Sequence, residues 1–271
     1  MELSSSKSIS AGVMENKPMM LQKSLYEFEK HIDMEKFSKV FTPEIKKVIS
    51  VVRKYGFDIR VVGGAVRDFL QGIEPRDVDF ATDAEPAELI FIFDLENIHY
   101  EADGIVHGTI KAVFGKEKIE VTSIGYRLKK VNNTIDIERH NSWAFDSMSR
   151  DITVNSMSID MNGVLYDYQN AIHDLKKQLV RFCPNIQNKI DQDPTNLLRW
   201  IKAIAHFEKP KWLKKDKEVV KANVGKLKDI KDVKRTKLLL AGLLSSPNKT
   251  KVFKLMCDIG IAQELDLTCK N

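Results

Sequence analysis

The chain has 271 residues, of which 43% are apolar and 30% are charged, a composition typical of a globular protein with a sizeable core. Its longest apolar run, residues 89–93, is far shorter than the roughly 20 residues that span a bilayer, so we expect no membrane-spanning segment. The three cysteines, Cys183, Cys257 and Cys269, form no C-x-x-C pair. This pattern argues against a disulfide framework or a structural zinc site and favours a reducing compartment, the cytoplasm.

Charge is divided unevenly along the chain. Residues 1–170 carry a formal net charge of −6, whereas residues 171–271 carry +11. A lysine-rich half is the electrostatic feature expected of a protein with a polyanionic partner. A solvated helical surface has the same composition, so the charge alone leaves both interpretations open.

The first elements follow a segment that we expect to be flexible, since residues 1–20 lack the apolar core of a signal peptide. Thr42 and Pro43 have the residue types that cap and begin a helix, and apolar residues follow at helical spacing. The predicted elements in this part are a helix over residues 42–56, a strand over 59–62, a helix over 65–71, a strand over 78–81, a helix over 85–93, and a hairpin with strands over 109–114 and 118–123.

The second half of the chain has fewer strand signals. Residues 125–149 are polar and irregular and predict a mobile loop, which a helix over 152–159 and a strand over 164–168 follow. From residue 171 onward the pattern is helical. The sequence therefore predicts an α/β (α+β) head with a mixed sheet and an all-helical region after it. The expected divisions are a flexible or helical segment over 1–40, the head over 41–170, and a basic helical neck and body over 171–271.

Two aspartates, Asp77 and Asp79, stand at positions i and i+2 of the predicted strand or its edge. Side chains at this spacing point to the same face of a strand, so the two carboxylates would lie side by side. Such a pair repels unless a cation lies between them, and Mg²⁺ is commonly held by one or two carboxylates together with substrate phosphates. An isolated D-x-D pattern is also common on edge strands, so this pattern alone does not decide.

A glycine turn lies about a dozen residues before the aspartates. Gly63 and Gly64 connect a strand to a helix, and the backbone N–H groups at such a helix start suit an anion. Arg67 lies in the first turn of this helix, where it can reach a phosphate. An anion site, an arginine and a carboxylate pair within 17 residues form a more specific set than any one of them.

Four stretches resemble the class II tRNA nucleotidyltransferases, the family of CCA-adding enzymes and bacterial poly(A) polymerases. The first runs from Val62 to Asp68 and continues through Asp77 and Asp79 to Thr82. The second, from Arg150 to Met157, is similar to the motif R-R-D-F-T-I-N-A-M. The other two resemble D-x-x-G-x-x-x-D…D-L and E-D-P-x-R-x-L-R, and they comprise Asp160, Gly163, Asp167, Asp174, Leu175 and Arg181, and then Asp193, Pro194, Leu197, Leu198 and Arg199.

The resemblance implies a nucleotidyltransferase head and a role for each matching residue. Asp77 and Asp79 would be catalytic and bind Mg²⁺, and Glu120, in a predicted strand, is a candidate third catalytic carboxylate or an ordinary surface carboxylate. The implied reaction is in-line attack of an RNA 3′-hydroxyl on the α-phosphate of CTP or ATP, with release of pyrophosphate. The implied nucleotide-binding residues are Gly63, Gly64, Arg67, Arg150, Asp151, Asn155, Asp193, Asn196 and Arg199, with Asp151 at the ribose and the last three at the base.

The chain departs from the family pattern at several positions. Asn196 stands where the family has its base-reading arginine, Gln192 replaces the preceding glutamate, and Ser149 and Gly125 replace two further arginines. An amide offers fewer donors than a planar guanidinium, so the choice between CTP and ATP is open. About 60 residues follow Phe207, which leaves room for a reduced helical body only.

We expect addition of C and/or A to the 3′ end of tRNA, with tRNA, CTP and ATP as partners. Full CCA addition, addition of only C or only A, and poly(A)-type tailing all fit the motifs. A catalytically weak RNA-binding relative and a nucleotidyltransferase that blocks tRNA ends are the alternatives from other classes. The resemblance favours contact of the lysine-rich stretch 209–237 with the RNA backbone. Trp143, Trp200 and Trp212 could stack on bases, although packing in the core is the simpler role. Nothing in the sequence predicts the oligomeric state.

Overall fold

A mixed eight-stranded sheet forms the centre of the head. The computed structural model describes residues 30–131, 134–184, 186–230, 233–244, 246 and 248–269. The strand order is β1-β10-β9-β2-β3-β6-β5-β4, and only β3 and β6 pair in parallel. In chain order the strands are β1 (Lys30–His31), β2 (Ile59–Val62), β3 (Asp79–Thr82), β4 (Tyr100–Glu101), β5 (Thr109–Phe114), β6 (Glu117–Ser123), β9 (Ser158–Asp160) and β10 (Val164–Tyr166).

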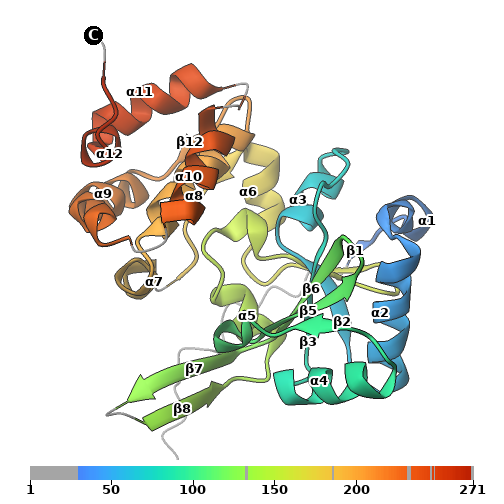
Figure 1. Cartoon of the computed structure of the whole chain (residues 1–271). Coiled ribbons are helices and arrows are strands. Elements are labelled where there is room, and N and C mark those ends of the chain that lie inside the picture. The colour runs from blue at the N-terminus through green and yellow to red at the C-terminus, as the bar shows by residue number, and fades with distance from the viewer. Residues whose placement is uncertain are drawn as a thin grey trace, which may run out of the picture.

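Helices cover this sheet, and the longest begins as the sequence predicts. The Thr42 hydroxyl accepts a hydrogen bond from the N–H of Ile45 at 3.1 Å, which caps α2 (Pro43–Lys54). Figure 1 shows α2 and α4 (Pro86–Leu95) beside the sheet. The other helices of the head are α1 (Met34–Phe37), α3 (Gly64–Leu70) and α5 (Trp143–Met148), with short 3₁₀ turns η1 (Ser38–Val40), η2 (Ile105–His107) and η3 (Thr153–Asn155).

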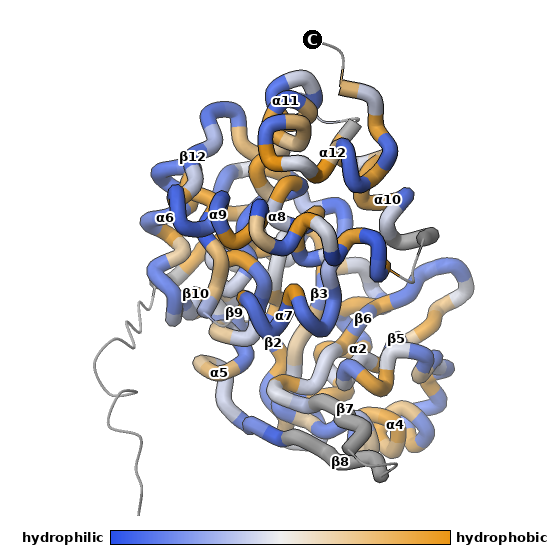
Figure 2. Tube along the Cα trace, turned by 90° about the vertical axis from the view of Figure 1, so that its left-hand side faces the viewer, coloured by the Kyte–Doolittle hydropathy of each residue, from blue (hydrophilic) through white to orange (hydrophobic). Residues whose placement is uncertain are grey.

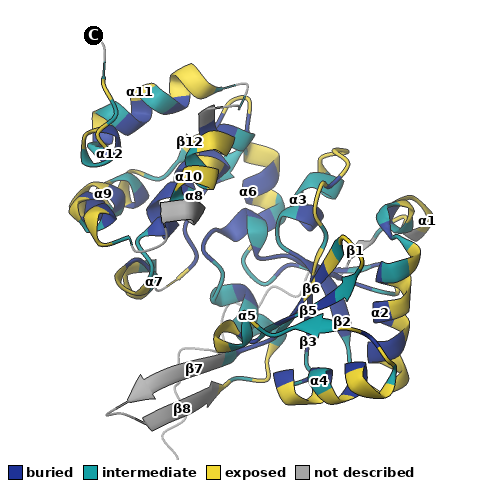
Figure 3. Cartoon of the chain, in the orientation of Figure 1, coloured by how far each residue is buried: buried dark blue, intermediate teal, exposed yellow. Residues whose placement is uncertain are grey.

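A second, helical part follows the head (Figure 1) and confirms the predicted helical region. Its elements are α6 (Ala171–Lys177), α7 (Ile186–Gln192), α8 (Thr195–His206), α9 (Lys214–Asn223), η4 (Val224–Asp229), α10 (Val233–Leu244), α11 (Lys249–Ile259) and α12 (Ile261–Glu264). Most of α8 is buried, including Trp200, and Figure 3 shows this helix largely in the colour of buried residues. Trp200 therefore packs in the core.

The helical prediction has one exception. The two-residue strands β11 (Leu179–Val180) and β12 (Lys211–Trp212) pair in parallel and form a small separate sheet. Hydrophilic and hydrophobic stretches alternate along the helices around it (Figure 2), as expected for helices that bury one face. The predicted divisions at residues 40/41 and 170/171 stay predictions, and residues 1–29 of the first segment lie outside the described residues.

Two sequence predictions in the middle of the chain are wrong. Residues 125–149 do not form an irregular loop: β7 (Tyr126–Val131) and β8 (Thr134–Arg139) pair as an antiparallel hairpin, and α5 follows it. Residues 152–159 do not form a helix but the turn η3 and the start of β9, which pairs with β2. The two errors differ in cause. β7 and β8 are consecutive segments, and the alternation of polar and apolar residues over 134–138 is a local strand signal that the prediction overlooked, whereas β9 pairs with β2 far earlier in the chain.

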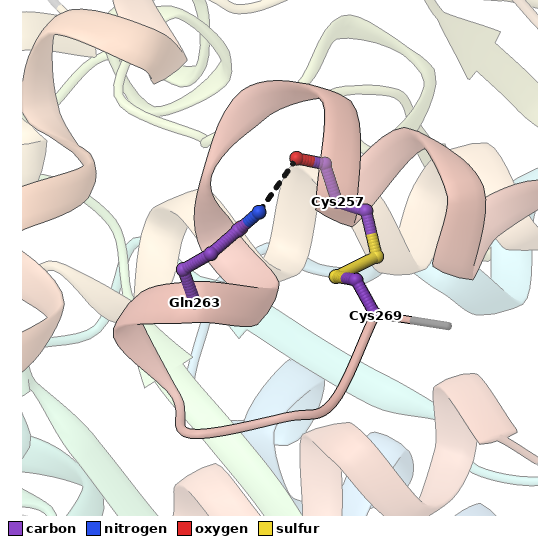
Figure 4. The surroundings of a disulfide bond; sticks show 3 residues. All are labelled: Cys257, Gln263 and Cys269. Carbon is purple, nitrogen blue, oxygen red and sulfur yellow. Dashed lines mark hydrogen bonds between the residues drawn. A yellow bond between two sulfur atoms is a disulfide. The ribbon is translucent and has the colours of Figure 1, made fainter. Parts of the chain in front are cut away.

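The cysteine prediction is also wrong. Cys257 and Cys269 form a disulfide, with their Cα atoms 6.1 Å apart, between α11 and the chain that follows α12 (Figure 4). Cys183 is a buried free thiol, and burial is the main cause that raises its pKa to about 12. Within the described residues, every helix is too short or too polar to cross a membrane.

Three aspartates of the third motif hold the backbone together. Asp160 accepts hydrogen bonds from the N–H groups of Asn162 and Val164 in the β9–β10 turn. Asp167 accepts three from the backbone at the start of α6. Asp174 is buried and accepts from the Thr153 hydroxyl and from Arg181. These contacts fix the segment that joins the head to the helical part.

Candidate active site

The two aspartates of the first motif lie at the start of β3. The strand begins at Asp79, one residue later than predicted, so Asp77 belongs to the segment before it. The carboxylates nevertheless interact electrostatically, and Asp77 is one of the groups that raise the pKa of Asp79. Because Asp77 lies before β3, the prediction that both side chains share one face of a strand stays a prediction, and the electrostatic interaction is what supports a pair.

Asp79 is the electrostatic centre of the site. Asp79 is exposed to solvent at the start of β3, but the protein atoms around its carboxylate make desolvation the largest cause that raises its pKa. The negative charge of Glu120 follows, and Arg150 lowers the pKa. Glu120 is half exposed on β6 and lies 3.6 Å from the ammonium of Lys111 on β5. Within the described part of the chain, no group of three or more His, Cys, Asp or Glu side chains is arranged to hold a metal ion. The arrangement is thus two interacting carboxylates with a third nearby, Glu120, which shares the Lys111 ammonium with Asp103.

The glycine turn places α3 directly after β2. Gly63 has φ +76° and ψ −138°, a conformation that an L-residue with a side chain rarely adopts. A Cβ atom at Gly64 would lie 3.5 Å from the Arg67 guanidinium, which folds back over this turn. Arg67 donates to Asn155 Oδ1 at 2.9 Å and to Asp68 Oδ1 at 2.8 Å, and only 14% of its side chain is exposed. The turn and its arginine are therefore held in one geometry.

The second motif supplies a second arginine. Arg150 binds Asp146 of α5 with its Nε and Nη2 atoms, at 3.1 and 2.7 Å. Burial alone would lower the pKa of Arg150, and nearby carboxylates, led by Asp146, raise it, so the guanidinium is a permanent cation beside Asp79. The Asp151 carboxylate is buried and accepts a hydrogen bond from Arg199 Nε at 2.8 Å.

The fourth motif lies at the start of α8. Arg199 is 41% exposed and, like Arg150, lowers the pKa of Asp79. Asp193 accepts from the N–H and the hydroxyl of Thr195, which closes the turn before α8. Asn196 is buried, and its amide donates to the carbonyl groups of Lys189 and Asp193. Asn196 thus ties α7 to α8 through backbone contacts.

Two departures from the family pattern have a local explanation. A Cβ atom at Gly125 would lie 2.1 Å from the carbonyl oxygen of His140, so no side chain fits at the open end of the β7–β8 hairpin, next to the Tyr126–Arg139 pair. Ser149 follows α5, and its hydroxyl donates to the carbonyl of Asp146. Trp143 lies with its ring 4.0 Å from the buried Arg60 guanidinium, which supports packing as its role.

Sequence reasoning missed the partners of the site residues. Asp68 and Asp146 orient Arg67 and Arg150, and Lys111 faces Glu120. The spacing i, i+4 between Asp146 and Arg150 is a helical ion-pair signal that could have revealed one of them. The other pairs depend on tertiary contacts or side-chain geometry that no local pattern shows.

Comparisons with known proteins agree with this architecture. A family profile described as "Poly A polymerase head domain" matches residues 59–181, which include the first three motifs. CCA tRNA nucleotidyltransferase 1, mitochondrial, of Mus musculus is 30% identical over 246 residues, which are 89% of this chain and 56% of that protein. The CCA-adding enzyme of Lactobacillus johnsonii is 26% identical and covers 84% of this chain and 56% of its own length. The chain thus spans a little over half the length of these relatives.

Solved structures show the same fold. The Bacillus stearothermophilus CCA-adding enzyme in complex with CTP superposes with a TM-score of 0.69 at 24% identity, covering 82% of this chain and 53% of its own. The Thermotoga maritima CCA-adding enzyme complexed with tRNA_CCA gives 0.68 at 21%, covering 89% and 57%. The fold is that of a nucleotidyltransferase head with a helical region. Residues 59–181 thus match the poly(A) polymerase head domain family, and the chain is similar to CCA-adding tRNA nucleotidyltransferases over most of its length.

Proposed function

We propose that the protein is a template-independent RNA nucleotidyltransferase that adds C and/or A to the 3′ end of tRNA from CTP and ATP, releasing pyrophosphate. The observation that carries the proposal is the convergence of charges on Asp79, which interacts with Asp77 and Glu120 and with the guanidinium groups of Arg150 and Arg199. Paired carboxylates beside fixed cations suit phosphoryl-type transfer, in which positioning and electrostatic stabilisation do most of the work.

The residues at this site fit a divalent cation. The pKa of Asp79 is raised by desolvation and by the charges of Glu120 and Asp77, a repulsion that a bound cation would relieve. Asp77 and Asp79 would hold Mg²⁺ as oxygen ligands, together with substrate phosphates. When bound, the ion would favour ionisation of the attacking 3′-hydroxyl and stabilise charge on the leaving oxygen. Glu120, with Lys111 3.6 Å away, adds negative charge beside Asp79.

The cations of this chain would orient the nucleotide. Arg67 and the N–H groups after Gly63 and Gly64 would bind the triphosphate, since the guanidinium is already fixed by Asp68 and Asn155. Arg150 would neutralise charge that develops beside Asp79.

Arg199 would reach the base or the ribose, with Asp151 as its buried partner. Asp193 and Asn196 shape this side of the site by fixing the turn between α7 and α8.

The structure supports the choice between C and A less directly than it supports the reaction. Because the Asn196 amide is occupied by backbone carbonyls, it would not read a base as an arginine does, so selection would fall to Arg199 and the shape of α8. Full CCA addition is the product we favour. Addition of only C or only A, poly(A)-type tailing and a catalytically weak RNA-binding protein are the alternatives.

The helical part would contact the RNA. Within the stretch 209–237, Lys226 and Lys228 form ion pairs with Asp191 and Glu264. Exposed lysines such as Lys214 and Lys215, which line a groove between α7 and α9, would contact phosphates.

We propose the cytoplasm as the compartment, where the Cys257–Cys269 disulfide would be reduced to two thiols.

Nucleotide incorporation tests this proposal. Three tRNA transcripts that end before C74, after C75 and after A76 are each supplied with CTP, ATP or both, and the products are sequenced. Growth that stops at CCA is the expected result. Long A tails would identify a poly(A)-type enzyme, and addition of one nucleotide type only would identify a partial one. No incorporation by a folded protein would overturn the proposal in favour of an RNA-binding relative.

A further inference from the structure

A chain of polar contacts joins the end of α8 to the arginine of the glycine turn. His206, the last residue of α8, has its Nε2 atom 2.7 Å from Gln71 Oε1 and 3.5 Å from Asp68 Oδ1. Asp68 in turn accepts hydrogen bonds from Arg67, which also reaches Asn155. The contacts run from the helical part of the protein to α3 of the head.

The partners of His206 define which of its nitrogens carries the proton. Both atoms near Nε2 are oxygen acceptors, so Nε2 is the donor and the ring binds Gln71 as an N–H donor. Burial is the main cause that lowers the pKa of His206 to about 4; the charge of Arg67 adds to this effect, and the nearby Asp68 carboxylate opposes it. The ring is therefore neutral at pH 7 and acts by its hydrogen bond and its position.

The other end of the same helix face also contacts the site. Arg199 and His206 are seven residues apart, two turns of helix, so they lie on the same face of α8 about 10 Å apart along its axis. Arg199 binds Asp151 and His206 binds the α3 side. Helix α8 thus has side-chain contacts to the head at two points, Arg199 with Asp151 and His206 with Gln71.

The end of α8 is itself firmly held. Phe207 is buried, with 1% of its surface exposed, and its carbonyl accepts a hydrogen bond of 2.6 Å from Asn248 before α11. A shift of α8 would therefore reach α3 through His206 rather than be absorbed by a loose helix end.

We propose that His206 is a positioning residue that, through its hydrogen bond to Gln71 at the end of α3, holds the Arg67–Asp68 pair in the orientation that binds the nucleotide triphosphate. This inference rests on the proposed function, because it assigns Arg67 to the triphosphate. It goes further in coupling that contact to α8, the helix that bears Arg199 on the base side. A helix with these two contacts makes the orientation of the phosphate-binding arginine depend on the placement of the base-side helix.

The test measures binding of inorganic triphosphate and of CMP by calorimetry, with the full chain and without catalysis. His206→Phe keeps a ring of similar shape but removes the donor. We expect about three- to tenfold weaker triphosphate binding, the effect of one lost hydrogen bond, and unchanged CMP binding. His206→Gln retains an N–H donor and should restore most of the affinity. His99→Phe, at an exposed histidine between α4 and β4, is the matched control and should change neither affinity.

A double-variant comparison identifies the route of the effect. In an Arg67→Ala background, His206→Phe should cause no further loss of triphosphate affinity, because its target is absent. An additional loss of the same size would overturn the inference. If His206→Phe does not fold, Gln71→Ala removes the acceptor from the exposed side and should weaken triphosphate binding similarly.

The outcomes separate this inference from the proposed function. If the wild-type chain binds neither triphosphate nor CMP, the proposed function fails. If it binds both, and Arg67→Ala weakens triphosphate binding while the His206 and Gln71 variants do not, only the role of His206 fails. Equal losses for triphosphate and CMP would show a merely structural contact and would also overturn it.

Discussion

The two sides of the proposed nucleotide site differ in how firmly their cations are held. On the α3 side, Arg67 is 14% exposed and is bound by both Asp68 and Asn155. On the α8 side, Arg199 is 41% exposed and has Asp151 as its bonded partner. The triphosphate is the same in CTP and ATP, whereas the bases differ. A fixed cation thus suits the constant part of the substrate and an exposed one suits the variable part.

Loss of the Asp77–Asp79 pair would remove the proposed metal ligands, on which catalysis depends whichever nucleotide is bound. The double substitution Asp77→Ala/Asp79→Ala should reduce the rate of incorporation by about a thousandfold or more, because a bound cation stabilises the transition state by several kcal/mol. Initial rates on a tRNA transcript would measure this. Asp94→Ala, at an exposed aspartate of α4, is the matched control and should retain the wild-type rate. Equal rates for the double variant and the wild type would exclude the carboxylate pair from catalysis.

Single arginine substitutions address the comparison itself. Arg67→Ala should weaken CTP and ATP binding equally, by about ten- to a hundredfold, because it removes a charged hydrogen-bond donor from the phosphates. Arg199→Ala should cost less than tenfold and should change the ratio of the two affinities. Calorimetric titration of both nucleotides gives these numbers. If Arg67→Ala changed the ratio of CTP to ATP affinity and Arg199→Ala did not, Arg67 would be the residue on the base side and the assignment of the two arginines would be reversed.

The turn between α7 and α8 gives a smaller effect on stability. Asn196→Ala removes two side-chain hydrogen bonds between α7 and α8, although the carbonyls of Lys189 and Asp193 keep their backbone donors, so the free energy of unfolding should fall by about 1–3 kcal/mol. Triphosphate affinity should stay within about twofold, because Asn196 lies on the α8 side. Urea unfolding measures the first quantity, with the exposed Asn188→Ala as a control expected within about 0.5 kcal/mol of wild type. Wild-type stability of Asn196→Ala would show that these amide contacts contribute little.

Competition between a proton and a divalent cation for the Asp79 carboxylate should give the smallest effect. Since desolvation, Glu120 and Asp77 raise its pKa, Asp79 takes up a proton at a higher pH than a free carboxyl group, and the protonated form is a poor metal ligand. In the metal-free protein a raised pKa contributes stability at low pH, and this contribution is lost as the pH rises through that pKa. Mn²⁺ affinity should therefore decline as the pH falls through the same range.

The variant Glu120→Gln tests the cause of this shift. It removes one of the negative charges, so the pH at which Mn²⁺ affinity declines should move downward by a fraction of a pH unit to about one unit. Titration of Mn²⁺ at a series of pH values measures the midpoint. An upward movement of the midpoint, or none, would contradict the role of Glu120 as a neighbouring charge.

Local sequence patterns predicted the elements that depend on local signals. Helix α2 has its cap at Thr42, and the glycine turn and the Asp77–Asp79 pair follow in the predicted places. The strand β9 was missed because its partner β2, far away in the chain, decides its conformation, whereas the β7–β8 hairpin pairs neighbouring segments and its local alternation was overlooked. The Cys257–Cys269 disulfide was missed because the turn at Gly260 and α12 bring two distant residues together.

The candidate site shows the same limit at the level of side chains. The motif residues mark where the charges lie, but the structure reveals what each one binds. Asn196 is the clearest example, since its sequence position suggests the base and its amide contacts two backbone carbonyls. His206 lies outside the quoted motifs, and only the packing of α8 against α3 reveals it.

The most direct test of the account is the mass of the 3′-terminal fragment of a tRNA transcript that ends before C74, after incubation with the wild-type chain, CTP, ATP and Mg²⁺. The account predicts a gain of two cytidylates and one adenylate, and none when the metal is chelated. An unchanged mass in the presence of Mg²⁺, with a folded chain that binds CTP, would contradict it.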